Sequence, residues 1–408
     1  MGEKIYLAQD AHVVKHNVAQ NLTNEQKAQA RLNIGAMAAF GAAMTPAEIQ
    51  GIVDANLNAE LLPFGTQIIQ QWARNANTEY AMPWDVVHNK DYEMTIKSHF
   101  CLPDEVVFDE PEAIYAAPEG GLAAGQYYIS IGYAYGDGWS TSKHINFTLT
   151  EAMEEGDQLV INCGTNNAND PTNGRTWNVY AAGSTVSKQT GVTSDSDTGT
   201  ELGSTSTSGV GYTNGQINAP QRIVYGYNRW SQCWYRQWLN SDAAAGSVYE
   251  VQNIWDRPPA QAATLRGFMA GLPADFKAIL QKCTVTTALN TVEGASSDTE
   301  TTQDYFFLPS LTEMYINPQY AEGDEWDYYK ALAQGAGFVG KFPTGQNIDV
   351  LKHYRLDAQT SAAYVRLRSA YRGYAINTWY VSSYGYVYYY NAYNAFRGCP
   401  ACKIRKSA

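Results

Sequence analysis

The segment TWYVSSYGYVYYYNAYNAFRGCPAC, residues 378–402, alternates between two kinds of side chain over its first half. The odd positions are Trp379, Val381, Ser383, Gly385, Val387 and Tyr389. The even positions are Tyr380, Ser382, Tyr384, Tyr386, Tyr388 and Tyr390. Because a β-strand sends successive side chains to opposite faces, we expect the odd set to face the core and the even set to face solvent. Gly385 is predicted to mark a turn between two strands.

An outward row of tyrosines needs a reason, since an exposed aromatic surface promotes association. The chain has 30 tyrosines among 408 residues, and this segment combines them with serine and asparagine. Antibody loops use the same residues, because tyrosine offers contact area with few torsions to freeze and serine adds adaptable hydrogen bonds. We interpret the even face as a binding surface. The alternative is a tyrosine-rich seam between subunits.

The composition of residues 371–394 suggests how this surface varies. The range contains no Lys, Gln, Glu or Met, and none of these can be encoded by a codon that ends in a pyrimidine. Tyr, Asn, Ser, Ile, Ala and Thr all can. An asparagine AAY codon with randomised adenines yields that set and never a stop codon.

Residues 364–404, YVRLRSAYRGYAINTWYVSSYGYVYYYNAYNAFRGCPACKI, resemble the variable region of diversity-generating retroelement target proteins. Those proteins display variable residues on a C-type-lectin-type domain, often at the tip of a phage fibre. The constant frame is matched here by Arg366-Leu367-Arg368-Ser369, Trp379, Val381, Gly385, Val387 and residues 396–402. The resemblance implies that the variable, ligand-binding positions are Tyr371, Tyr374, Ile376, Asn377, Tyr380, Ser382, Ser383, Tyr384, Tyr386, Tyr388, Tyr390, Asn391, Tyr393 and Asn394. We expect the flanking members of this set to point outward too.

Upstream segments resemble the body of the same domain. They are WSQCWYRQWLNS at 230–241 and FFLPSLTEMY at 306–315. The helical spacing of Trp230, Trp234 and Trp238 predicts one buried face. The resemblance implies an α+β, C-type-lectin-type (formylglycine-generating-enzyme-like) ligand-binding domain at 63–103 and 221–408. Within it, GTQIIQQWARN at 65–75 is predicted to be a short helix.

Residues 104–220 differ in pattern from this domain. GQYYISIGYAYGDGW, KHINFTLT, DQLVINC and TWNVYAAG are short alternating strands separated by Gly, Asp and Ser turns. Such spacing predicts a small all-β sandwich of the immunoglobulin-like kind. We place it as an insertion into the lectin-type domain.

Residues 1–62 are rich in Ala, Asn and Gln, contain no Trp, and predict two short helices. Such helices bury little alone, so we expect them to pack against copies of themselves. LTNEQKAQARLNIGA, residues 22–36, is similar to a segment that recurs in phage tail fibres. This resemblance implies a tail-attachment and oligomerisation segment and a homotrimer.

Charge and motifs argue against several other functions. The formal net charge is −12, which is poorly suited to binding nucleic acid or an anionic membrane. No apolar run approaches the length of a membrane span, and the N-terminal residues do not read as a signal peptide. No hydrolase motif, phosphate loop or dinucleotide fingerprint occurs, and the calcium motifs of sugar-binding lectins are missing. We expect no cofactor and no metal. The six cysteines are predicted to be mostly free, with Cys399 and Cys402 as structural thiols that cannot be matched to the formylglycine-generating pair.

The sequence thus predicts a non-enzymatic phage receptor-binding protein, made in a host cytoplasm and carried on the virion at the tail-fibre tip. Its partners would be a bacterial surface receptor, protein or glycan, and other tail proteins. Two alternatives remain open. One is a fibre-borne glycan-degrading enzyme, which needs a carboxylate pair in a cleft. The other is a structural fibre component whose tyrosine face is an intersubunit seam.

Overall fold

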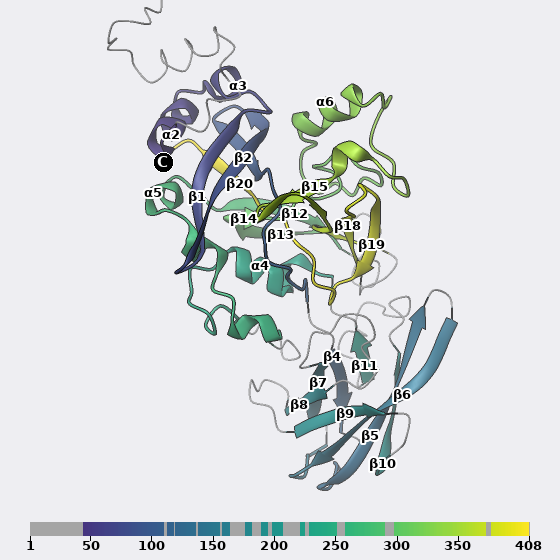
Figure 1. Ribbon diagram of the computed structural model, residues 1–408. Helices are drawn as coiled ribbons and strands as arrows, with labels where there is room; N and C mark the ends of the chain where they lie inside the picture. Colours follow the sequence, from purple (N-terminus) through teal and green to yellow (C-terminus); the bar gives the residue numbers. More distant parts are fainter. Residues whose placement is uncertain are drawn as a thin grey trace, which may run out of the picture.

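The computed structural model describes residues 44–109, 112–117, 119–135, 138–155, 157–163, 176–181, 189–194, 198–206, 221–224, 228–250, 258–289, 298–372 and 377–407. Within these ranges the chain is a mixed α+β structure, built mostly of strands in several small sheets with a few short helices (Figure 1). The mixed class predicted from the sequence is confirmed. The predicted fibre segment at 22–36 lies outside the described residues.

A five-stranded sheet forms the centre of the main body, in the order β1-β2-β3-β20-β14. Its strands are β1 (Gln67–Asn75), β2 (Thr78–Lys90), β3 (Glu93–Ser98), β20 (Ala401–Arg405) and β14 (Phe306–Phe307). The predicted helix at 65–75 is wrong, because β1 is a strand paired antiparallel with β2. Ile68 and Trp72 are both buried, and their spacing of four fits one helical face as well as alternate strand positions. Periodicity alone could not separate the two.

Two helices precede this sheet and pack on it. They are α2 (Pro46–Asp54) and α3 (Asn58–Leu61), and α2 begins with a capping box between Thr45 and Glu48. Ile49, Ile52 and Val53 of α2 are fully buried in the main core. The expectation that this helix packs against other copies is therefore wrong: it covers its own chain's sheet, and the body begins before residue 62.

A second sheet is formed by β4 to β11 (Figure 1). It has its own hydrophobic core, which contains Ile129, Ile145 and Leu159. Its order is β10-β5-β6-β9-β8-β7-β4-β11. The strands are β4 (Glu112–Ala116), β5 (Gly125–Tyr135), β6 (Gly138–Leu149), β7 (Gln158–Cys163), β8 (Thr176–Ala181), β9 (Gln189–Ser194), β10 (Thr200–Ser206) and β11 (Gln221–Val224). The four strand segments quoted from the sequence all form strands here.

The borders and form of this second unit differ from the sequence prediction. The β11 strand pairs with β4, so the unit extends to Val224 rather than ending at 220. Val106 bridges to Phe396, and Phe108 lies in the main core, so residues 104–109 belong to the main body. A sandwich of two separate sheets was predicted. Instead β9 pairs with both β6 and β8, which joins all eight strands into one hydrogen-bonded sheet.

Short helices and two hairpins complete the main body. The helices are η5 (Trp230–Gln232), α4 (Trp234–Leu239), η6 (Ala260–Ala263), η7 (Phe268–Gly271), α5 (Ala274–Ala278), α6 (Asp327–Gly335) and η8 (Asp349–Leu351). The hairpins pair β12 (Cys283–Ala288) with β13 (Thr299–Asp304), and β15 (His353–Arg355) with β16 (Ala358–Ala363). Trp230, Trp234 and Trp238 are all buried, as their spacing predicts. Among the described helices, none has the length and apolar character needed to cross a bilayer.

A three-stranded antiparallel sheet carries the tyrosine-rich segment. Its strands are β17 (Val365–Ala370), β18 (Asn377–Val381) and β19 (Val387–Asn391), in that order. β17 is buried along its whole length. The β18–β19 hairpin therefore rests against a strand that is fixed in the core.

Candidate functional site

The β18–β19 hairpin keeps one side-chain parity through its turn. Val381 pairs with Val387, and Tyr380 pairs with Tyr388. The loop between the strands has five residues, so odd positions pair with odd and even with even. Gly385 has φ +74°, in the left-handed region, and residues 383–385 form the predicted turn.

The odd face is the core side, as predicted. Trp379 is 5% exposed, and Val381 and Val387 are fully buried. Gly385 is also buried, because the carbonyl of Ile348 lies where its Cβ would be. The Ile348 amide in turn donates to the Gly385 carbonyl at 3.2 Å, which fixes the turn to the body.

The even face carries the exposed rings. Tyr384 is 63% exposed, Tyr388 40% and Tyr390 37%, whereas Tyr380 and Tyr386 are half-buried. The prediction that these five tyrosines lie on the outward side is confirmed for the three exposed ones and holds in part for the other two.

Two further aromatic residues extend this surface. Tyr364 is 42% exposed, and its ring centroid lies 5.7 Å from that of Tyr380 and 5.6 Å from that of Phe396. Phe396 also lies 5.1 Å from Tyr380 and 6.3 Å from Tyr390. We define the aromatic face as Tyr364, Tyr380, Tyr384, Tyr386, Tyr388, Tyr390 and Phe396.

Sequence reasoning left Tyr364 and Phe396 out of the binding set. Tyr364 has the even parity of the face and directly precedes β17, a signal that could have found it. Phe396 had no such signal, since it reaches the face through a parallel bridge between Val365 and its neighbour Arg397.

A buried arginine supports the aromatic face from beneath. Arg366 has no exposed surface, and its guanidinium carbon lies 4.2 Å from the centre of the Phe396 ring. It donates to Thr378 Oγ1 at 2.6 Å and to the carbonyl of Asn394 at 2.7 Å. It also donates to the carbonyl of Asn391 at 3.1 Å. These bonds tie β17 to β18 and to the loop after β19.

Burial lowers the pKa of Arg366 to about 9, so it remains charged at neutral pH. Within the described residues it has no carboxylate partner. The charge is therefore stabilised by neutral hydrogen-bond acceptors and by the Phe396 ring.

Four predicted binding residues are buried instead of exposed, so their predicted orientation is wrong. They are Asn377, Ser382, Tyr393 and Asn394. Ser382 is 4% exposed because its hydroxyl accepts the backbone N–H of Tyr384 at 3.2 Å and of Tyr386 at 3.0 Å. It shapes the turn. Asn377 is held in β18 beneath Asn228, whose amide donates to its carbonyl at 2.7 Å.

The remaining members of the predicted set occupy intermediate places. Ser383 and Asn391 are half-buried. Tyr371 is half-buried and stacks on Tyr389, with ring centroids 3.6 Å apart. Tyr374 and Ile376 lie outside the described residues.

A charged network lies behind the sheet on β17. Arg368 forms an ion pair with Glu313, with 2.9 Å between Nη2 and Oε1, and donates to the carbonyl of Glu322 at 2.7 Å. Burial raises the pKa of the Glu322 carboxyl, which accepts from the Ala288 amide and the Ser369 hydroxyl. Arg368 thus locks β17 to the body, while Arg366 supports the aromatic face.

The cysteines contribute to packing. Cys101, Cys233, Cys283, Cys399 and Cys402 are free and buried. Burial raises the pKa of Cys399 to about 11, and that of Cys402 well above its usual value. Neither is a thiolate at neutral pH, which agrees with the predicted structural role.

The aromatic face can bind but has little means for chemistry. Its groups are phenol rings, phenol hydroxyls and one phenyl ring. Burial raises the pKa of Tyr380, and a hydrogen bond with Tyr389 raises that of Tyr388, so both hydroxyls stay protonated and can donate. Such a surface offers flat apolar contact with hydrogen bonds at its edges.

Comparison with known proteins gives one match. A family model described as a domain of unknown function (DUF6273) matches residues 212–406, which include the aromatic face and β20. No curated protein and no solved structure matches this chain.

Proposed function

We propose that this protein is a receptor-binding protein of a phage tail fibre, and that the aromatic face contacts a receptor on the bacterial surface. The observation that carries the proposal is the row of exposed rings on a hairpin whose opposite side is buried. Exposed aromatic residues of this number mark interaction sites, and central aromatic residues usually dominate binding energy.

The way the face is held supports binding to varied partners. The turn is fixed by Gly385 and Ser382, and β17 is fixed by Arg366 and Arg368. None of these four residues contributes an exposed ring. Substitutions among the rings would therefore alter the contact surface while the supporting contacts persist.

The same proposal includes a retroelement origin for this variation and a C-type-lectin-type fold for the body. The composition of residues 371–394 and the match of the constant frame support the first. The mixed α+β body supports the second. A homotrimer and attachment to other tail proteins through the N-terminal segment complete the proposal.

The coding DNA tests the retroelement part. We expect a near-copy of the sequence that encodes residues 371–394 close by, beside a reverse transcriptase gene, with AAY codons where this chain has Tyr, Ser or Asn. A locus without such a repeat would contradict the retroelement while leaving receptor binding open.

Cell binding tests the function itself. Fluorescently labelled full-length protein is incubated with a panel of bacterial strains, and bound label is counted by flow cytometry. We expect binding to a subset of strains and its loss in Tyr388→Ser. The matched control is Tyr92→Ser, since Tyr92 is also 40% exposed but lies between β2 and β3. Equal loss of cell binding in both variants, or no loss in either variant, would contradict the proposal.

A further inference from the structure

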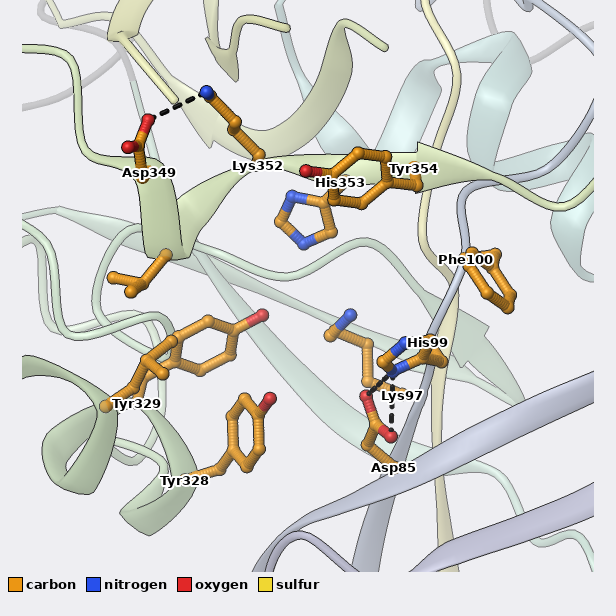
Figure 2. Close-up of a pocket in the computed structure, with 12 residues that line it drawn as sticks. Asp85, Lys97, His99, Phe100, Tyr328, Tyr329, Asp349, Lys352, His353 and Tyr354 are labelled. Atoms are coloured by element: carbon orange, nitrogen blue, oxygen red, sulfur yellow. Dashed lines mark hydrogen bonds and ion pairs between the residues drawn. The ribbon is translucent and has the colours of Figure 1, made fainter. Parts of the chain in front are cut away.

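A concave site lies in the main body, and none of its lining residues belongs to the aromatic face. It is enclosed by residues of β2, β3, α6, η8 and β15, and its cavity has a volume of about 270 Å³ (Figure 2). An apolar cavity of about 150 Å³ holds a benzene molecule. This cavity therefore has room for a six-membered ring with substituents. Val350 and Tyr354 at its rim are each 40% exposed, so a ligand can enter from solvent.

Lys97 brings a buried positive charge to this cavity. Its side chain is 2% exposed, and its ammonium donates to the carbonyl of Ser98 at 2.7 Å. Within the described part of the chain it forms no ion pair. A buried ammonium has three N–H donors and is costly to leave unpaired. In Figure 2 this group points into the cavity, toward the side where Tyr328 and Tyr329 lie.

The carboxylates of the cavity are already engaged. Asp85 accepts from His99 at 2.8 Å and from Gln67 at 3.0 Å. Asp349 is paired with Lys352 at 2.7 Å. Lys97 is thus a cation of the cavity that forms no ion pair among the described residues, although Asp85 lies opposite it in the β2–β3 register.

The other polar groups of the cavity suit a ligand with hydroxyls. Burial raises the pKa of Tyr328 and Tyr329, so both phenols stay protonated and can donate. Burial and the nearby Lys97 charge lower the pKa of His353, so its imidazole is neutral. Its Nδ1 is buried and has no hydrogen-bond partner in the described residues. The tyrosine rings add an apolar wall, as small-molecule sites commonly have.

We infer that this cavity binds a small hydroxylated carboxylate, of the size and chemistry of a sugar acid. The carboxylate pairs with the Lys97 ammonium, and the hydroxyls bond to Tyr328, Tyr329 and His353. The inference does not rest on the proposed function, because none of these residues belongs to the aromatic face.

Calorimetric titration of the full-length protein tests this with D-glucuronate, D-glucose and inorganic phosphate at one ionic strength. We expect D-glucuronate to bind and D-glucose to bind at least about tenfold more weakly, since a charge-assisted bond is lost. Lys97→Met should weaken glucuronate binding by a similar factor. The matched control is Lys330→Met, because Lys330 lies on α6, which lines the cavity, but pairs with Glu325 and is not itself a lining residue. It should leave the affinity unchanged.

A second variant covers the case in which Lys97→Met fails to fold. Tyr328→Phe removes only one hydroxyl and should weaken glucuronate binding several-fold while glucose binding hardly changes. Tyr388→Ser should bind glucuronate like the unaltered protein, which separates this site from the aromatic face. Equal binding of glucose and glucuronate, tighter binding of phosphate than of glucuronate, no binding of any probe, or unchanged affinity in Lys97→Met and Tyr328→Phe would each overturn the inference.

Discussion

The two faces of β18 and β19 differ in burial although the same two strands, each of five residues, supply both. Trp379, Val381 and Val387 point into the main core, while Tyr388 and Tyr390 point to solvent. The strands therefore separate two tasks by residue parity. The odd face contributes to the core, and the even face presents rings that the core does not bury.

The largest effect is expected on the core face. Trp379→Ala should lower the free energy of unfolding by about 3–5 kcal/mol, because it removes a buried indole and leaves a cavity. Urea unfolding followed by circular dichroism measures this. A loss below about 1 kcal/mol would show that the odd face is not part of the core.

Arg366 departs most from the pattern in which even positions face solvent. It pairs with Tyr380 in the strand register, yet it is fully buried. Arg366→Met should lower the free energy of unfolding by about 2–3 kcal/mol, as several charged hydrogen bonds are lost and the burial cost of the charge is relieved. The control is Arg355→Met, whose pair with Asp357 lies nearer the surface and is worth under about 1 kcal/mol. Equal losses in the two variants would mean that Arg366 gives no special support.

Lowering the pH should reduce the stability of the fold through a group in the cavity lined by α6, and not through the hairpin. The pKa of His353 is lowered in the folded protein, so below about pH 6.5 the unfolded chain takes up a proton that the folded protein does not. Stability should therefore fall with falling pH, by up to about 1.4 kcal/mol per pH unit in this window. Urea unfolding between pH 7 and pH 5 measures the slope for the unaltered protein and for His353→Gln.

The slope should be smaller in His353→Gln and unchanged in Tyr388→Ala, because the hairpin rings do not titrate in this range. Equal slopes in all three proteins would show that the acid sensitivity comes from other groups.

Ser382 tests the difference between the two faces at the turn. It has the even parity of the exposed face, but its hydroxyl accepts hydrogen bonds from two backbone amides. Ser382→Ala should cost about 1 kcal/mol, since two backbone amides lose their acceptor. Ser383→Ala is the matched neighbour and should cost less. Chemical unfolding of both variants measures whether the loss in free energy of unfolding follows the hydrogen bonds, as expected, or the residue parity.

The smallest effect on stability is expected on the exposed face. Tyr388→Ala should change the free energy of unfolding by no more than about 0.5 kcal/mol. It should nevertheless weaken binding to a responsive bacterial strain more than tenfold, as a central aromatic contact of about 2 kcal/mol is lost. If it unfolds the protein instead, the two faces are not separate in the way described.

The hairpin could be predicted from the sequence because its information is local. Alternation in steps of two fixed the parity of Trp379, Val387 and Tyr388, and Gly385 fixed the turn. Ser382 was misplaced because a short hydroxyl can bond backbone amides as well as face solvent. Phe396 was missed because its place depends on a pairing with β17, more than twenty residues earlier in the chain.

The cavity could not be predicted in the same way. Lys97 and His353 lie on strands that are far apart in the sequence, and α6 supplies the rings between them. Nothing in the residues around Lys97 shows that its ammonium is buried without a counterion. The helix α2 was assigned to a fibre segment for the same reason, since its buried face meets a sheet completed by β20.

The position of β20 has a consequence for how the protein is made. This strand lies between β3 and β14, yet it is translated after the whole tyrosine-rich segment. During synthesis the central sheet lacks the strand between β3 and β14 until residues 401–405 have left the ribosome. A frameshift or premature stop anywhere within residues 371–394 removes the strand that closes it. Such a chain would be left with an unpaired sheet edge, a feature that promotes aggregation and clearance. The central sheet can therefore be completed only in a chain whose reading frame is intact through residues 371–394.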